Sequence, residues 1–136
     1  MLTRRHLIAA ALAAPLPALA AGRPVVTILG DSITAGFGLP ASAAFPARLQ
    51  AELAKLGRSA VIRPAGVSGD TTAGGLARVD FSVQRDTTLC IVALGGNDLL
   101  QGLKPGTTKA NLDAIVKRLK ARKIRVLLAG LAAPPA

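Results

Sequence analysis

Three short polar stretches of the chain hold residue types that acyl-transfer chemistry uses. Residues 30–32 read Gly-Asp-Ser, residues 66–71 read Gly-Val-Ser-Gly-Asp-Thr, and residues 95–98 read Gly-Gly-Asn-Asp. A serine hydroxyl can attack a carbonyl carbon, and backbone N–H groups with an amide side chain can stabilise the charge that develops on the carbonyl oxygen. The candidates for these two roles are Ser32 and Asn97.

Apolar runs precede these stretches and predict the strands that position them. Each run is nearly continuous in aliphatic residues and is separated from the next by a segment with helical periodicity. Strands of this kind are typical of a parallel sheet that helices cover on both faces, which is the α/β class. The predicted strands are residues 25–29, 60–62, 89–94 and 126–129.

Three helices are predicted between the strands, the last of them near residues 108–123. The first is expected to end at Gly57, since glycine is the usual residue after a helix C-terminus. The residues expected to face the core are Phe45, Leu49, Leu53 and Leu56 in the first helix, Leu76 and Val79 in the second, and Leu112, Ile115, Val116 and Leu119 in the third.

All three polar stretches follow a predicted strand, which places them at the same edge of the sheet. In an open parallel sheet, ligands bind at the carboxyl ends of the strands, where the strand order reverses. A flavodoxin-like order of 2-1-3-4-5 puts that switch point between the first and third strands. Ser32 and Asn97 would then face each other across one crevice, with Gly69 alongside.

Each stretch also has a structural interpretation. Ser32 could cap the helix that follows it, because Gly-Asp-Ser is common turn chemistry. Asn97 could likewise cap a helix or form an Asx-turn. The glycines of residues 66–75 could cradle a phosphate at a helix N-terminus, although neither GxGxxG nor GK[ST] is present. These alternatives describe an acyl- or phosphate-binding module rather than an enzyme.

Taken together and in order, the three stretches resemble the first three sequence blocks of the GDSL, or SGNH, hydrolases. Residues 30–36 resemble the first block, residues 66–72 the second, and residues 95–98 the third. The resemblance runs from about Val25 to the last residue, and it is greatest to the bacterial arylesterases that also act as acyl-CoA thioesterases and lysophospholipases. It implies a three-layer α/β/α fold with a flavodoxin-like parallel sheet.

The resemblance also implies roles for individual residues. Ser32 would be the nucleophile, and the oxyanion hole would comprise the backbone N–H groups of Ser32 and Gly69 and the side-chain amide of Asn97. Gly30 and Asp31 would form the supporting turn. The implied substrates are small carboxylic esters and acyl thioesters, and no metal or cofactor is implied.

The fourth block of the family is an Asp-x-x-His that supplies the general base, and the 136 residues do not contain it. The only histidine is His6, close to the N-terminus. The expectation is a domain truncated after about its fourth strand and inactive in this form, or else a non-catalytic remnant. With no histidine nearby, Asp70 and Asp98 are expected to have structural roles.

Residues 1–20 have the pattern of a signal peptide. Arg4 and Arg5 form a positive start, a short apolar segment follows, and residues 18–20 (Ala-Leu-Ala) match an A-x-A cleavage site. Paired arginines also occur in twin-arginine signals, so two export routes stay open. We expect cleavage at that site, a mature domain over residues 21–136, and a periplasmic or secreted location.

The chain carries 17 basic and 7 acidic residues, and six of the cations lie within residues 117–125. They are expected on the solvent face and last turn of a helix, where the helix dipole favours them. Contact with an anionic lipid surface is the alternative to a solvated face. No nucleic-acid partner is expected, because three Phe are the only aromatic residues available for base stacking. The oligomeric state is not predicted.

Cysteine and histidine counts exclude two kinds of site. A single cysteine, Cys90, cannot form an intramolecular disulfide, and one histidine leaves no His/Cys zinc set. Cys90 lies within a predicted strand and is expected to be an inert core residue.

A hydrophobic content of 51% excludes intrinsic disorder. No apolar run approaches the roughly 20 residues of a membrane-spanning helix.

Overall fold

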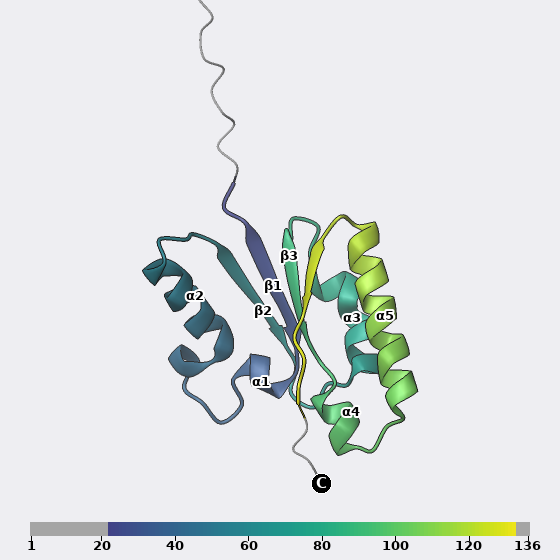
Figure 1. The fold of residues 1–136 in the computed structure, drawn as a ribbon. Helices are drawn as coiled ribbons and strands as arrows, with labels where there is room; N and C mark the ends of the chain where they lie inside the picture. The colour runs from purple at the N-terminus through teal and green to yellow at the C-terminus, as the bar shows by residue number, and fades with distance from the viewer. Residues whose placement is uncertain (1–21, 133–136) are drawn as a thin grey trace, which may run out of the picture.

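The computed structural model describes residues 22–132, which form one sheet and its covering helices (Figure 1). The predicted signal peptide lies outside this range. No helix within it has the length and apolar character needed to cross a membrane. The elements, in chain order, are β1 (Val25–Gly30), α1 (Ser32–Ala35), the 3-10 helix η1 (Ala41–Ala43), α2 (Phe45–Lys55), β2 (Val61–Gly66), α3 (Thr72–Ser82), β3 (Leu89–Ala93), α4 (Gly96–Leu100), α5 (Pro105–Ala121) and β4 (Arg125–Leu128).

The four strands are parallel and stand in the order β2-β1-β3-β4. This confirms the predicted α/β class and, for these strands, the flavodoxin-like order. The order reverses at β1, which pairs with β2 on one side and with β3 on the other. Because the strands run in one direction, the segments after β1, β2 and β3 meet at one edge, where α1 and α4 also lie (Figure 1).

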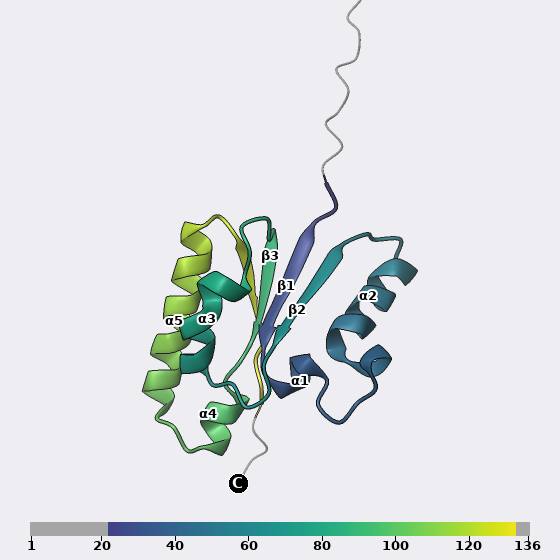
Figure 2. The ribbon, with the colours of Figure 1, turned by 180° about the vertical axis from the view of Figure 1, so that it is seen from behind.

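Helices cover both faces of the sheet and give the predicted three layers, as the views from opposite sides show (Figures 1 and 2). On one face, α2 packs Leu49 and Leu53 against a buried cluster that β1 and β3 supply. On the other face, α3 and α5 lie side by side over the larger cluster. Its fully buried members include Leu29, Val79, Val83, Val92, Ile115 and Leu119.

Short helices and an extended strand distinguish the structure from the sequence-based prediction. α1, η1 and α4 are too short to show a hydrophobic period, and the sequence pattern predicts none of them. β2 continues to Gly66, beyond the predicted residues 60–62. The reason is that β2 is an edge strand of the sheet, where Pro64 is tolerated although it lacks an N–H group.

The inward face of α2 is narrower than predicted. Leu49 and Leu53 pack against the core, but Phe45 is 39% exposed and Leu56 is 73% exposed. Phe45 begins the helix and Leu56 follows its last residue, so each lies about one turn beyond the pair that contacts the sheet. The expectation that these two residues face the core was wrong.

Cys90 lies in β3 and is fully buried, which confirms its expected place in the core. Burial raises the pKa of the Cys90 thiol to about 11. The thiol is therefore protonated at neutral pH, and thiols react as thiolates. The buried side chain has the inert character expected of it.

Candidate active site

Ser32 is the first residue of α1, and only Asp31 separates it from the buried end of β1. The cap of this helix is Asp31, which is 5% exposed and whose Oδ1 accepts the backbone N–H of Ile33 at 3.0 Å. The interpretation of Ser32 as a helix cap is therefore wrong, because the neighbouring carboxylate has that role. The Ser32 residue is half-buried at the predicted edge of the sheet.

Gly66 brings the turn after β1 against the end of β2. A Cβ atom at this position would lie 2.5 Å from the backbone N of Ala35 and 2.9 Å from the backbone O of Asp31, so only glycine leaves room for this approach. The backbone N–H of Val67 also donates to the carbonyl of Gly30 at 3.0 Å. The turn at Gly30 and Asp31 is therefore supported by the loop after β2 as well as by its own strand.

The third polar stretch reaches the second through Asn97. Its Nδ2 donates to the backbone O of Asp70 at 2.8 Å. The preceding residue, Gly69, has a φ of +83°, a conformation that glycine adopts without strain. The bond uses one of the two amide hydrogens of Asn97 and leaves the second to donate elsewhere. Asn97 does not cap α4, since Gly95 is the N-cap residue.

A buried carboxylate lies next to Asn97 in the chain. Asp98 is 2% exposed, and its oxygens accept from the backbone N–H of Thr72 at 2.8 Å and from the hydroxyls of Thr72 and Thr108. Asn111 donates in turn to the Thr72 hydroxyl at 3.0 Å. These bonds tie α4 to the first turns of α3 and α5, which agrees with the structural role expected for Asp98.

The same contacts argue against a phosphate site at the start of α3. The N–H of Thr72 is bonded to the Asp98 carboxylate, and the N–H of Gly74 is bonded to the Thr71 hydroxyl at 3.3 Å. A phosphate would need these donors, and it would also meet the negative charge of Asp98. The interpretation of residues 66–75 as a phosphate cradle is therefore not supported.

Asp98→Asn is expected to lower the free energy of unfolding by about 1–3 kcal/mol, the cost of leaving buried polar groups poorly satisfied. Burial alone raises the pKa of Asp98, but hydrogen bonds from Thr72 and Thr108 outweigh it and hold the pKa below its ordinary value. The ionised carboxylate thus stabilises the fold above the unfolded pKa of about 3.9, and the contribution is lost as the pH falls through the native pKa. Urea denaturation at neutral and acid pH measures both effects.

Asp113 on α5 provides the matched control. A hydrogen bond from Lys109, 2.6 Å away, lowers the pKa of Asp113 as well, but this pair is exposed. Exposed helical ion pairs contribute little, so Asp113→Asn should leave the free energy of unfolding nearly unchanged. Equal losses in the two variants would contradict a structural role for the buried cluster.

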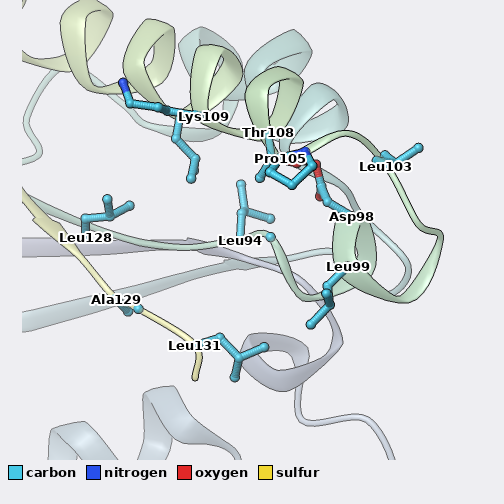
Figure 3. A pocket seen from close by; sticks show the side chains of 13 residues that line it. Leu94, Asp98, Leu99, Leu103, Pro105, Thr108, Lys109, Leu128, Ala129 and Leu131 are labelled. Carbon is cyan, nitrogen blue, oxygen red and sulfur yellow. Dashed lines mark hydrogen bonds between the residues drawn. The ribbon is translucent and has the colours of Figure 1, made fainter. Parts of the chain in front are cut away.

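An apolar cavity adjoins the site between α4, the first turns of α5 and the ends of β3 and β4 (Figure 3). Its volume is about 410 Å³, and six of its thirteen lining residues are leucines, with Asp98 and Lys109 also among the lining residues. A second cavity of about 230 Å³ shares Leu94 and Leu131 with the first and extends to Asp31. This edge of the sheet therefore offers apolar space next to the polar stretches.

Sequence reasoning did not identify two side chains that build this edge. Thr108 lies in the first turn of α5, ten residues after Asp98, and only the folded structure shows that its hydroxyl bonds the Asp98 carboxylate. Arg78 is a single cation within α3, where a solvated position is the default expectation. The one sequence feature that could have indicated its burial is its position next to Val79, which faces the core.

The turn that carries Ser32, the glycine loop and the Asn97 amide thus lie together at the switch point of a parallel sheet. The model of the GDSL-like lipase/acylhydrolase family matches residues 28–136. The chain belongs to this family. The match confirms the resemblance that the three polar stretches carry.

Relatives of this GDSL-like chain are esterases and thioesterases by name. It is 37% identical over 133 residues to esterase TesA of Pseudomonas aeruginosa, covering 97% of this chain and 66% of that protein. It is 38% identical over 116 residues to thioesterase 1/protease 1/lysophospholipase L1 of Escherichia coli K12, covering 85% and 54%. The solved structure of AlinE4, an SGNH-hydrolase family esterase, has a TM-score of 0.79 at 47% identity and covers 83% and 61%. The chain spans between about half and two thirds of these relatives.

Proposed function

We propose that the complete protein is an exported serine hydrolase of this family, with Ser32 as nucleophile, that cleaves small carboxylic esters or acyl thioesters. The observation that carries the proposal is the direct contact among the three stretches. The Asn97 amide bonds the residue after Gly69, and Gly66 packs this loop against the turn at Asp31. The names of the relatives support the substrate class.

In the proposed reaction, Ser32 Oγ attacks the carbonyl carbon of the substrate, and the carbonyl oxygen becomes negatively charged. The backbone N–H groups of Ser32 and Gly69 and the second amide hydrogen of Asn97 donate to that oxygen. Collapse of the tetrahedral intermediate releases an alcohol or thiol and leaves an acyl-enzyme, which water then hydrolyses. The apolar cavities beside the site suit the acyl chain of such a substrate.

The proton of Ser32 must pass to a base for this attack to occur. Residues 22–136 contain no histidine, while Asp70 pairs with Arg78 and Asp98 bonds to Thr72. The Asp-x-x-His block of the family supplies the base in the complete enzyme, and the 136-residue chain alone is inactive. Ester hydrolysis by a chain that carries this block, with and without Ser32, tests the assignment.

The proposal includes peripheral contact with anionic lipid at the opposite end of the molecule. Lys120 and Lys123 are exposed near the end of α5, as predicted for a solvated face, and Phe81 on α3 is 90% exposed. Phe81 borders a surface hollow that Arg85 and Arg122 also line. Cations attract anionic headgroups by about 1 kcal/mol each, and an aromatic ring favours the membrane interface.

Cell fractionation tests export and lipid contact together. The complete protein is expected outside the cytoplasm, partly on membranes and released from them by about 1 M salt, which screens charge. Phe81→Ser combined with Lys120→Glu and Lys123→Glu should remove the membrane-bound fraction and leave export intact.

Arg4→Lys with Arg5→Lys should block export only on the twin-arginine route. Cytoplasmic retention would refute export, and salt-resistant binding by both forms would refute the lipid contact.

A further inference from the structure

Arg78 connects the segments that surround the site through one guanidinium group. Its Nε donates to Asp70 Oδ2 at 2.7 Å, and its Nη2 donates to the backbone O of Gly30 at 2.9 Å. Its Nη1 donates to the backbone O of Ala65 at 3.0 Å and to the Ser82 hydroxyl at 3.1 Å. A single side chain of α3 thus binds the ends of β1 and β2 and the loop that follows β2.

These contacts lie close along the chain to the proposed oxyanion donors. Asp70 directly follows Gly69, and its backbone O holds the Asn97 amide. Gly30 precedes Ser32 by two residues, and its carbonyl accepts from Arg78 as well as from the loop after β2. Each proposed donor therefore lies close to a group that Arg78 bonds. Gly69 is next to Asp70 in the chain, Asn97 is hydrogen-bonded to Asp70, and Ser32 is two residues after Gly30.

We propose that Arg78 is the positioning residue of the oxyanion hole, an inference that rests on the proposed function. By holding the Asp70 carboxylate, Arg78 fixes the Asp70 backbone. The direction of the Gly69 N–H and the rotation of the Asn97 amide both depend on that backbone. By holding the Gly30 carbonyl, Arg78 also fixes the turn that presents the nucleophile.

The arrangement requires the shape of a guanidinium as well as its charge. Arginine presents five N–H donors in a rigid planar fork, whereas a lysine ammonium is a compact charge on a flexible stem. The side chains of Arg78 and Asp70 are only 19% and 12% exposed, so water has limited access to replace the lost donors. A lysine at position 78 can face Asp70 but cannot reach the Gly30 and Ala65 carbonyls in the same geometry.

Arg78→Lys and Arg78→Met test the inference in a chain that carries the Asp-x-x-His block. Both are expected to lower kcat about 10²-fold, because misplacement by about 1 Å costs roughly that much rate. KM should change by less than about threefold, since oxyanion donors act on the transition state rather than on the bound substrate. The NMR signals of the Gly69 N–H and the Asn97 side-chain amide should shift in both variants.

Arg63 makes a matched arginine–aspartate pair away from the site. It lies in the middle of β2, in register with Thr27, and its Nη1 and Nη2 donate to Asp86 at 2.8 and 3.0 Å. Arg63→Met is expected to leave kcat and both NMR signals unchanged. An equal loss of kcat in Arg63→Met would mean a general effect of removing a cation and would overturn the inference.

The two proposals fail by different results. Folded Arg78 variants with unchanged kcat and unchanged NMR signals would overturn the positioning role while leaving the hydrolase proposal in place. Hydrolysis that survives Ser32→Ala would overturn the proposed function. The Gly69 and Asn97 signals would then still decide whether Arg78 positions these groups, because they require no turnover.

Discussion

Ser32→Ala is expected to abolish ester hydrolysis in a chain that carries the Asp-x-x-His block. A serine hydroxyl is a weak nucleophile until a base takes its proton, and the capping role next to it is already filled by Asp31. The 136-residue chain should show little or no turnover of p-nitrophenyl butyrate. In serine hydrolases that lack the base, binding and the oxyanion hole leave only roughly 10³–10⁴-fold acceleration over water.

The experiment compares the 136-residue chain with a form in which the C-terminal segment of a relative such as esterase TesA follows residue 132. Ser59→Ala is the matched control, since Ser59 is an exposed serine in the turn before β2. This control should retain full activity. Hydrolysis without Ser32 would refute the nucleophile, and Ser32-dependent hydrolysis by the shorter chain would refute its inactivity. A folded extended chain with no activity would favour the non-catalytic remnant.

Asn97→Ala is expected to lower kcat about 10²–10³-fold in the same extended chain, which corresponds to about 2.7–4 kcal/mol of transition-state stabilisation from one oxyanion donor. The geometry of the amide suits this proposed role. The bond from Nδ2 to the Asp70 carbonyl fixes the rotation of the side chain and leaves one N–H available. Steady-state kinetics should show the loss in kcat with KM nearly unchanged.

Asn111→Ala is the matched control for this substitution. Asn111 also donates an Nδ2 hydrogen, to the buried Thr72 hydroxyl at 3.0 Å, but it lies on α5 within the cluster around Asp98. Its loss should lower stability and leave kcat within a fewfold of the parent value. If Asn97→Ala lowered only stability, or if both variants lost kcat equally, Asn97 would be a structural residue.

The sequence by itself determined the sheet and the edge at which the polar stretches meet. Near-continuous aliphatic runs specify parallel strands that are buried on both faces, and run length and periodicity are local properties. Because such strands share one direction, the residues that follow them come to the same edge. Ser32, Gly69 and Asn97 were placed there by this argument alone. The prediction ended the second strand four residues too early, because the chain alone does not show that β2 is an edge strand, where Pro64 is tolerated.

Only the tertiary structure decided which polar side chains hold this edge together. Asn97 bonds a carbonyl 27 residues away, and Arg78 bonds the Gly30 carbonyl 48 residues away. Local patterns place Arg78 on a predicted helix and Asp98 in a polar stretch after a predicted strand. Whether such a group is buried or solvated depends on partners that satisfy its charge and hydrogen bonds, and distant segments supply those partners. The hydrogen bonds that hold the site therefore form only when folding brings α3, α4 and α5 together.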